Sequence, residues 1–332
     1  MESVRVRYPG RICLLGDHCD WAGGSSLTVP TPMGIEVRAE RARDGLLVRS
    51  VMNGETFEQR FPIEMRPLAK GPLRFIPAIL NELLRSGVPV VPAELWVRSD
   101  LPAGRGLSSS ASFTLGVIDA LTRLSDRPLT NEQLMEAAFS VEHDHLGVGC
   151  GRLDQAACAA AEPLLLRWNG DNPALTTRLA PLGTVHLVVV VMNAPRNTAM
   201  ILSTLRRHHA APLGDPHGDA VREALSEFGT AAERGARALQ TGDLETLGAA
   251  MNSAQQLYDC NLAARFPELD APAVRRAIAD LRGLGSLGAK FSGAGGDGSV
   301  VGLFKDENTA RSAAVCLESE LVSTWYTPLK VA

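Results

Sequence analysis

A chain of 332 residues with 45% hydrophobic and 21% charged side chains can bury the core of one large or two ordinary domains, which excludes disorder as its main state. Its net charge is −4 and its lysines and arginines form no long run, so the basic surface of a nucleic-acid-binding protein is missing. The first ten residues contain no apolar core, and the most apolar stretch, 185–194, is too short to cross a membrane. Six scattered cysteines without Cys-x-x-Cys spacing are typical of reduced thiols, so we expect a cytoplasmic protein with no membrane partner.

The first half of the chain contains both strand and helix patterns. Residues 3–8 alternate apolar and charged side chains, which predicts a half-buried strand, and the apolar run 12–15 is expected to continue it. Thr130 and Gln133 form a capping-box pattern that predicts a helix from there to about residue 146. The other elements predicted in this half are strands at 35–40, 46–50 and 95–98 and helices at 73–85 and 109–124.

The second half begins with an apolar strand pattern at 185–192 and is then mostly helical. Because several predicted strands are adjacent in sequence, the pattern favours an α+β fold over a doubly wound parallel sheet. The least structured stretch is 169–184, and we expect a domain boundary there that divides the chain into 1–178 and 179–332. The remaining predicted elements are helices at about 197–209, 218–240, 243–262, 271–283 and 307–321 and strands at 289–292, 299–304 and 325–329.

Residues 102–111, Pro-Ala-Gly-Arg-Gly-Leu-Ser-Ser-Ser-Ala, form a glycine-rich connection between a predicted strand and a predicted helix. Such a turn lets backbone N–H groups approach an anion closely, and the positive end of the helix dipole adds to the attraction. The hydroxyls of Ser109 and Ser110 are suited to phosphate oxygens or a Mg²⁺ ion, and serines at a helix start also act as simple caps. Alone, the segment fits a phosphate loop and an ordinary connection equally well.

A second glycine cluster lies at residues 291–298, Phe-Ser-Gly-Ala-Gly-Gly-Asp-Gly. Its glycines satisfy G-x-G-x-x-G, but the dinucleotide-binding motif requires a helix directly afterwards, and residues 299–304 are predicted as a strand. We therefore expect a glycine loop between two strands and no Rossmann site. The chain also lacks the G-x-x-x-x-G-K-[ST] pattern of a P-loop. Two glycine clusters together indicate a phosphate ligand more strongly than either one alone.

Residues 9–24 place one cation, two carboxylates and a histidine around a short apolar strand. Carboxylates such as Asp17 and Asp20 accept hydrogen bonds from neighbouring hydroxyls, as the binding of a polyhydroxylated ligand requires. An acidic turn at the end of a strand is the simpler alternative. A metal site is a weaker alternative, because no second pair of suitably spaced ligands completes a tetrahedral set. Its ligands would be Cys13, His18 and Cys19.

A third polar region contains Glu142-His143-Asp144-His145 and, further on, Gly151-Arg152-Leu153-Asp154-Gln155. Taken alone, the first of these segments is typical of a solvated helix end. Asp154 differs, because it lies between Leu153 and a run of alanines. We therefore expect Asp154 to be buried, where its partner and its pKa would matter.

Together these segments resemble the GHMP kinases, the family of galactokinase, homoserine kinase, mevalonate kinase and phosphomevalonate kinase. Residues 11–24 are similar to the galactokinase signature region, 102–111 to the family's ATP loop and 289–298 to its C-terminal glycine motif, in the family's order. The resemblance implies an α+β, two-domain GHMP kinase fold with an N-terminal ribosomal S5 domain 2-like part and a C-terminal ferredoxin-like part. It also implies ATP and Mg²⁺ as cofactors.

The resemblance implies roles for single residues as well. Asp154 would be the catalytic carboxylate that orients or deprotonates the accepting hydroxyl, and Arg11 would stabilise that oxygen and the transferring phosphoryl group. Ser110 and Glu142 would hold Mg²⁺. The residues implied for ATP binding are Pro102, Gly104, Gly106, Leu107, Ser108, Ser109, Ser110, Gly293 and Gly295, and those implied for acceptor binding are Asp17, His18, Asp20 and Gly151.

The acceptor region is closer to galactokinase than to the mevalonate or homoserine branches, so the resemblance favours a sugar kinase that phosphorylates the anomeric hydroxyl. The chain departs from the galactokinase pattern, however, and these departures put galactose itself in doubt. A uronic acid, a heptose, a longer-chain sugar or a sugar phosphate is equally compatible. The departures are Asp17 for Glu, Cys13 for Asn and Trp21 for Tyr, together with Ser108 where the ATP loop commonly has Gly.

Three further alternatives stay open at this point. Arg152 and Arg196 would contact a second anionic group of the acceptor, or they are ordinary surface arginines. The acceptor could be a non-sugar alcohol, as in the mevalonate and homoserine branches. The chain could also be a sugar- and ATP-binding sensor that has lost catalysis, although it retains all four residues implied for catalysis and metal binding. The sequence is compatible with a monomer and with a homodimer.

Overall fold

The structure is a computed structural model that describes residues 3–52, 54–65, 71, 73–170, 172–192, 197–318 and 322–329. The chain forms two compact units. Unit 1 comprises Met1–Gly10, Thr31–Ala103 and Ser108–Ala161, and unit 2 comprises Arg11–Pro30, Gly104–Leu107 and Glu162–Ala332. The units are thus interleaved along the chain, whereas the predicted division into 1–178 and 179–332 is continuous. The position of that boundary stays a prediction.

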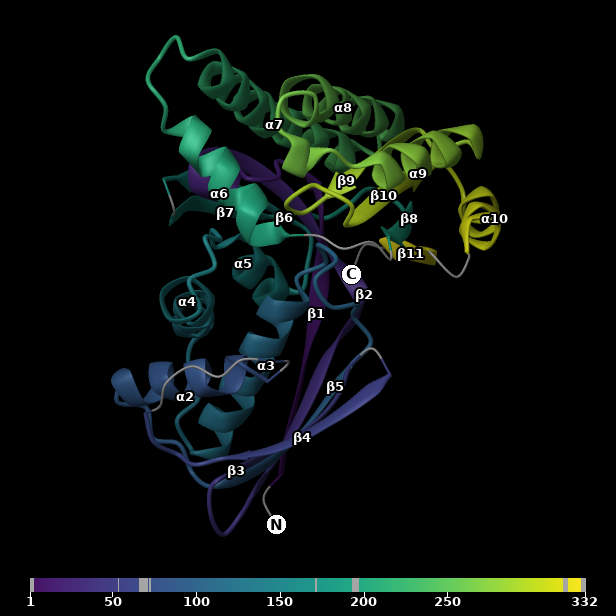
Figure 1. Ribbon diagram of the computed structural model, residues 1–332. Coiled ribbons are helices and arrows are strands. Elements are labelled where there is room, and N and C mark those ends of the chain that lie inside the picture. Colours follow the sequence, from purple (N-terminus) through teal and green to yellow (C-terminus); the bar gives the residue numbers. More distant parts are fainter. Residues whose placement is uncertain are drawn as a thin grey trace. The chain divides into compact units, whose positions relative to one another are not determined.

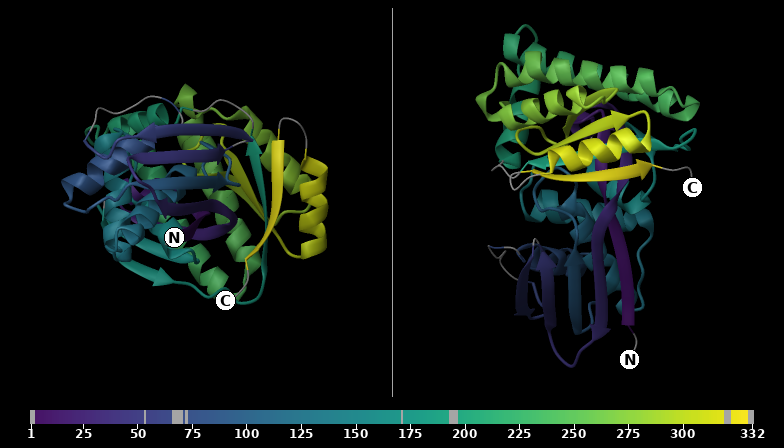
Figure 2. Two further views of the ribbon diagram at one scale, coloured as in Figure 1. Left: turned by 90° about the horizontal axis from the view of Figure 1, so that it is seen from below. Right: turned by 90° about the vertical axis from the view of Figure 1, so that its right-hand side faces the viewer.

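The strands of unit 1 lie side by side in the order β4-β3-β5-β2, with β1 paired to β2 (Figure 2). β3 and β5 are parallel, and the pairs β3–β4 and β2–β5 are antiparallel. β1 and β2 are long and continue into unit 2. The strand bounds are β1 Ser3–Leu15, β2 Gly24–Arg41, β3 Leu46–Met52, β4 Glu55–Phe61 and β5 Ala93–Ser99.

The helices of unit 1 gather around α3, which contacts α2, α4 and α5 (Figure 1). Most residues of α3 are buried, which fits its central place. α4 begins with the predicted capping box, in which Thr130 Oγ1 accepts from the Gln133 N–H and the Gln133 side chain accepts from the Thr130 N–H. A single π-helical turn, η1, continues α4. The bounds are α2 Phe75–Arg85, α3 Ser109–Leu124, α4 Asn131–Ser140, η1 Val141–His145 and α5 Leu153–Ala160.

Unit 2 contains an antiparallel sheet of four strands in the order β11-β8-β10-β9. β8 has the sequence Val-His-Leu-Val-Val-Val-Val-Met and lies inside the sheet, which explains why all of its side chains except that of His186 are buried. A hairpin of β6 and β7 pairs with the first residues of β2. The bounds are β6 Leu164–Asn169, β7 Asn172–Arg178, β8 Val185–Met192, β9 Gly288–Ser292, β10 Ser299–Phe304 and β11 Val322–Leu329.

Helices α8, α9 and α10 pack against the four-stranded sheet, and α7 packs along α8 (Figure 1). The long helix α7 starts where the Asp215 carboxylate accepts a hydrogen bond from the Gly218 N–H at 2.7 Å, and it ends at Gly242 with a φ of 71°. Along the described part of the chain, no helix is both long and apolar enough to span a membrane. The bounds are α1 Cys19–Ala22, α6 Thr198–His209, α7 Pro216–Thr241, α8 Leu244–Leu257, η2 Tyr258–Ala263, η3 Pro267–Leu269, α9 Pro272–Gly283 and α10 Glu307–Leu317.

Several of the elements predicted from the sequence are confirmed. The helix 109–124 has the same bounds in the structure, and the strand 185–192 is β8. The predicted glycine loop lies between β9 and β10, which are strands as expected. The helix predicted at 307–321 ends earlier, at Leu317, and residues 319–321 lie outside the described residues.

Other elements were missed. The stretch 169–184, predicted to be the least structured, contains β7, which pairs with β6 through its backbone. Its sequence has one large apolar residue, Leu175, so no strand pattern is visible. The strands β4 and β6 and the helices α1 and α5 were also not predicted. α5 has only eight residues, too few for a clear helical period.

Candidate functional site

Two glycine-rich segments meet beside Arg11 in unit 2. The Arg11 side chain is 4% exposed, and its Nη1 donates to the carbonyl oxygen of Gly106 at 2.6 Å. The Arg11 backbone N–H donates to the carbonyl oxygen of Leu107 at 3.2 Å. Gly293 has a φ of 93°, and a Cβ atom added there would lie 3.0 Å from the Cα of Gly106. The predicted ATP loop and the C-terminal glycine loop therefore touch, and both lie next to the predicted phosphate-binding arginine.

Asp17 connects the segment after β1 to the same glycine loop. Its carboxylate, 2% exposed, accepts from Lys290 Nζ at 2.6 Å and from the Gly293 N–H at 2.7 Å. The Cys13 N–H donates to Ser292 Oγ at 3.0 Å, which adds a second tie between the same segments. The predicted role of Asp17 in acceptor binding stays a prediction. The contacts that the structure gives to this carboxylate are structural ones.

Lys290 is a residue that the sequence analysis missed. Its side chain is 1% exposed, and its ammonium group also lies 4.3 Å from the centre of the Phe291 ring. A buried lysine requires a nearby anion, because an isolated charge away from water is very costly. The signal in the sequence was a lysine within the short apolar strand 289–292.

The predicted acceptor residues His18 and Asp20 flank the first residue of α1. Both are buried, and His18 has a φ of 68°, a left-handed conformation that is uncommon for a residue other than glycine. Trp21 Nε1 donates to His18 Nδ1 at 3.4 Å. On its other sides the Trp21 ring meets His209, at 5.6 Å between ring centres, and the Arg206 guanidinium, 4.9 Å from the ring centre. The Trp21 indole thus holds the segment of His18 and Asp20 against α6.

Glu142 is the central acidic residue of the site in unit 1. It lies on η1 and is 5% exposed; it accepts hydrogen bonds from the Ser110 hydroxyl and, at 3.0 Å, from Gln155 Nε2. Burial raises the pKa of Glu142 to about 7, and the charge of Asp154 acts in the same direction. The hydrogen bonds from Ser110 and Gln155 and the charge of Arg74 act in the opposite direction without cancelling the rise. A bound cation would remove the cost of ionising this carboxylate.

Asp154 and Gly151 lie at the start of α5 in unit 1. Asp154 is in the first turn of the helix and is only half-buried, which corrects the expectation of full burial. Of the alanines that suggested burial, Ala156 and Ala157 are buried, whereas Ala159 and Ala160 are half-buried like Asp154. Gly151 is buried just before the helix. The structure therefore brings Asp154, Glu142 and Ser110 together: Ser110 donates a hydrogen bond to Glu142, and the charge of Asp154 acts on the same carboxylate.

Ser108, Ser109 and Ser110 begin α3 as predicted, but the expected serine capping is wrong for the residue at the cap position. Ser108 has a φ of 62°, and its hydroxyl makes no capping hydrogen bond. The Ser108 Oγ atom is buried and has no hydrogen-bond partner among the residues that the structure describes. In this left-handed conformation the side chain does not reach the first amides of the helix. A helix start without its side-chain cap is suited to an anion.

The donor set in unit 1 fits Mg²⁺, which prefers oxygen ligands and usually keeps water and substrate phosphates among them. The Ser110 hydroxyl and the Glu142 carboxylate are oxygen donors in contact. The Gln155 Oε1 atom beside them is buried and has no hydrogen-bond partner within the described ranges. No group of three or more His, Cys, Asp or Glu residues suited to a metal occurs among the described residues. The protein would thus supply only part of the coordination sphere, as Mg²⁺–nucleotide sites do.

The other described residues that the sequence predicts for the site lie in the two glycine loops and on the surface of unit 1. Gly295 has a φ of 86°, and a Cβ atom there would lie 2.6 Å from the Tyr258 hydroxyl, so only glycine fits. Pro102 is half-buried and Gly104 is exposed with a φ of 70°. Arg152 pairs with Glu136, its Nε lying 2.9 Å from the carboxylate, and stacks on Phe139. Arg196 lies outside the described residues. The roles of all these residues stay predictions.

The raised pKa of Glu142 predicts a pH-dependent cost in the metal-free fold. Because this pKa lies above the ordinary value of 4.5, the stability that the protonated group contributes is full below pH 4.5 and is lost as the pH rises through about 7. We expect Glu142→Gln to raise the melting temperature, relative to wild type and in EDTA, by roughly 2 to 5 °C at pH 8 and by somewhat less than half as much at pH 5.5. Thermal melts at both pH values measure this, with Glu307→Gln, at an exposed position of α10, as the control. An equal difference at both pH values would show that Glu142 is ionised throughout.

The buried ion pair predicts a strong coupling between Asp17 and Lys290. Lys290→Met leaves the Asp17 carboxylate buried without its cation, and we expect the free energy of unfolding to fall by about 3 to 5 kcal/mol. The double variant Asp17→Asn/Lys290→Met removes both charges and should recover most of that loss. Urea unfolding of the single and double variants measures the coupling, with Lys305→Met, at the exposed residue that follows β10, as the control. A double variant as unstable as Lys290→Met would mean that the pair is not what holds the glycine loop.

Comparison with known proteins identifies the family. The model of the GHMP kinases N terminal domain matches residues 74–162, and that of the GHMP kinases C terminal part matches residues 236–323. A mevalonate kinase of Aeropyrum pernix is 28% identical over 323 residues, 96% of this chain and 94% of the relative. A galactokinase of Roseiflexus sp. is 28% identical over 357 residues, 97% of this chain and 88% of the relative.

The solved structures agree with the predicted fold. The structure of Lactococcus lactis galactokinase complexed with galactose has a TM-score of 0.82 at 19% identity and covers 100% of this chain and 94% of that chain. The α+β, two-domain fold predicted from the sequence is therefore confirmed. Galactokinases recur among the relatives, which supports the galactokinase-like branch, although mevalonate kinases match at similar identity. With both family models matched in order and three motif segments present, the chain belongs to the GHMP kinase family, whose members transfer a phosphoryl group from ATP to an alcohol.

Proposed function

We propose that this protein is an ATP-dependent sugar kinase that phosphorylates the anomeric hydroxyl of a galactose-like sugar, a uronic acid, a heptose or a sugar phosphate. The observation that carries the proposal is the buried polar segment before and within α1, in which His18 and Asp20 are buried and His18 accepts a hydrogen bond from the Trp21 ring. Side chains of this kind match the demands of several neighbouring hydroxyls. The corresponding region resembles galactokinase, and the L. lactis galactokinase structure was determined with galactose.

In this proposal the reaction proceeds by positioning and charge neutralisation. Asp154 orients the acceptor hydroxyl and accepts its proton while the acceptor oxygen bonds to the γ-phosphorus and the bond from that phosphorus to ADP breaks. Arg11 stabilises the charge on the transferring group, and its hydrogen bond to Gly106 holds its guanidinium beside the loop. The amides at the start of α3 bind phosphate oxygens. Ser110 and Glu142 would hold Mg²⁺, which when bound neutralises charge on the phosphates.

The test of this function is ADP release from Mg·ATP in the presence of a panel of acceptors. The panel contains free sugars, uronic acids, heptoses and sugar phosphates, with mevalonate and homoserine as non-sugar alcohols. We expect turnover with one sugar class, and NMR of the product should locate the phosphate on the anomeric oxygen. Turnover with mevalonate, which the Aeropyrum pernix relative favours as the second candidate, would replace the sugar by a non-sugar alcohol. Binding of ATP and sugar without turnover would favour the sensor alternative.

Asp154→Asn separates chemistry from nucleotide binding. The amide keeps the size of the side chain but cannot accept a proton from the acceptor, so we expect kcat to fall by about 100- to 10,000-fold. The Kd for ATP, measured by calorimetry, should change less than about threefold, since electrostatic repulsion between Asp154 and phosphates can only decrease. The control is Glu162→Gln, a carboxylate further along the chain that pairs with Arg178. Unchanged turnover in Asp154→Asn would move the catalytic role to another residue.

A further inference from the structure

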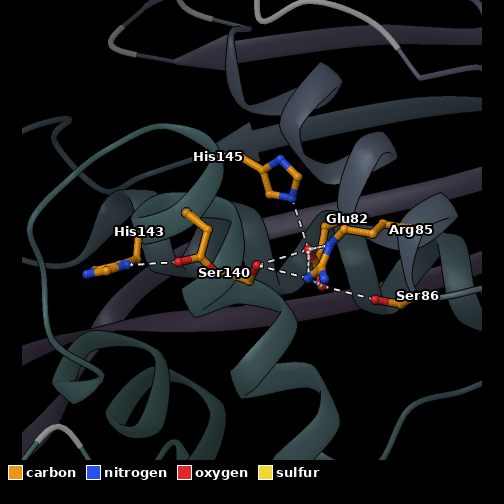
Figure 3. A network of polar contacts seen from close by, with 7 residues as sticks. Glu82, Arg85, Ser86, Ser140, His143 and His145 are labelled. Atoms are coloured by element: carbon orange, nitrogen blue, oxygen red, sulfur yellow. Dashed lines mark hydrogen bonds and ion pairs between the residues drawn. The ribbon is translucent and has the colours of Figure 1, made fainter.

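A buried carboxylate outside the proposed site ties two helices of unit 1 together. Glu82, on α2, is 4% exposed, and Figure 3 shows how the surrounding side chains point toward it. Its oxygens bind Arg85 Nη2 at 2.7 Å, Ser86 Oγ at 3.0 Å, Ser140 Oγ at 2.9 Å and His145 Nε2 at 2.9 Å. Four side chains therefore converge on one carboxylate that takes no part in the proposed chemistry.

Two of these four partners lie at the two ends of η1, the turn that carries Glu142. Ser140 is the residue just before η1, and His145 is its last residue. Glu142 lies between them, so Glu82 binds the turn on both sides of the proposed metal carboxylate. The turn is π-helical, a rare geometry that occurs mostly as single turns within α-helices and frequently at functional sites. The contacts from Glu82 hold this turn at both of its ends.

The charge state of Glu82 suits this role. Burial alone would raise the pKa of Glu82, but the hydrogen bonds from Arg85, His145, Ser140 and Ser86 outweigh burial and lower it. The carboxylate is thus ionised at neutral pH and can accept from all of its donors at once. Glu142, on η1, has fewer donors: it accepts from the Ser110 hydroxyl and from Gln155 Nε2. One carboxylate has a saturated set of donors, and the other is left available for a cation.

We propose that Glu82 is a positioning residue that holds η1 through Ser140 and His145 and so orients the Glu142 carboxylate toward the metal of the nucleotide. The inference rests on the metal role of Glu142 in the proposed function. Glu82 contacts neither nucleotide nor acceptor in this proposal. Its effect reaches the reaction only through the geometry of Glu142, as outer contacts do in other metal sites, where their loss typically weakens metal binding by 10- to 100-fold.

The surroundings of Glu82 make the test feasible. A cavity of about 410 Å³ adjoins the network and is lined by residues that include Glu82, Arg85, Ser140 and Arg152. Water can therefore reach the groups that a shortened or neutral side chain leaves without a partner, so a variant at this position should still fold. Glu82→Gln keeps the size of the side chain and one acceptor oxygen but loses the charge and the ability to accept from all donors.

Asp119 supplies a matched control. It is also a buried carboxylate of unit 1, 3% exposed, and it pairs with Arg123 Nε at 2.7 Å and with the Tyr8 hydroxyl at 2.8 Å. Within the described ranges, its side-chain hydrogen bonds go to Tyr8 and Arg123 and none reaches η1. Asp119 also belongs to no proposed binding group. Asp119→Asn should therefore reproduce the general stability cost of neutralising a buried, arginine-paired carboxylate without changing the metal site.

The experiment measures Mn²⁺ binding by electron paramagnetic resonance on the full-length protein in the presence of a non-hydrolysable ATP analogue. We expect Glu82→Gln to raise the Kd for Mn²⁺ about tenfold and Asp119→Asn to change it less than twofold. Hydrogen exchange gives a second readout, because the Leu146 N–H donates to the Val141 carbonyl at 3.1 Å and the Val148 N–H to the Glu142 carbonyl at 2.9 Å. Both amides should exchange at least about tenfold faster in Glu82→Gln than in Asp119→Asn.

His145→Ala is a milder variant, because it removes one anchor of η1 and leaves Glu82 with its other donors. It should change Mn²⁺ binding and exchange in the same direction as Glu82→Gln, by about threefold. Equal Mn²⁺ affinity in Glu82→Gln and Asp119→Asn would overturn the inference and reduce Glu82 to a stabilising residue. Neither measurement needs an acceptor. If the protein binds Mn²⁺ but phosphorylates nothing in the panel, the proposed function is wrong, and the Mn²⁺ and exchange measurements still decide whether Glu82 positions Glu142.

Discussion

The buried ion pair of Asp17 and Lys290 is the contact on which the arrangement of unit 2 around its glycine loops depends. Each residue alone would carry an uncompensated charge in the interior, at a cost of several kcal/mol. Together they can stay buried, and the pair joins the turn after β1 to β9, which is far away in the chain. The second oxygen of Asp17 then binds the Gly293 N–H, which places the loop of Gly293 against Gly106. One buried electrostatic contact thus helps to hold together two loops that the resemblance assigns to ATP.

Three buried carboxylates show how their surroundings separate structural from functional groups. Asp17 has a lysine and a backbone amide, and Glu82 has an arginine, a histidine and two serines. Glu142 has hydrogen bonds from Ser110 and Gln155 and the charge of Arg74 in its favour, and burial and Asp154 outweigh them and raise its pKa to about 7. The donors around Asp17 and Glu82 come from the protein itself and hold its parts in place. A bound cation would stabilise the charge of Glu142.

The sequence predicted what depends on local pattern and missed what depends on distant partners. Helix α3 was predicted to the residue because sixteen residues of helical spacing follow a glycine-rich turn. The β9–β10 loop was recognised because a strand pattern, rather than a helix, follows its glycines. Strand β7 was missed because its pairing with β6 uses the backbone, and Lys290 was missed because its partner Asp17 lies at the other end of the chain. For the site, the sequence predicts which residue types are present. It does not predict which of them form hydrogen bonds or ion pairs with one another.

The glycine loops also show how far the sequence alone can predict the structure. A glycine in the sequence indicates either conformational freedom or close approach, and only the structure separates the two. Gly104 has a positive φ and open space around it, whereas a Cβ atom at Gly295 would lie against the Tyr258 hydroxyl, which also accepts from the Gly296 N–H at 2.9 Å. The C-terminal loop is therefore shaped by packing within unit 2, before any nucleotide binds. Preorganised amides need not be ordered when a ligand binds, so in the proposed function this loop would bind phosphate at little entropic cost.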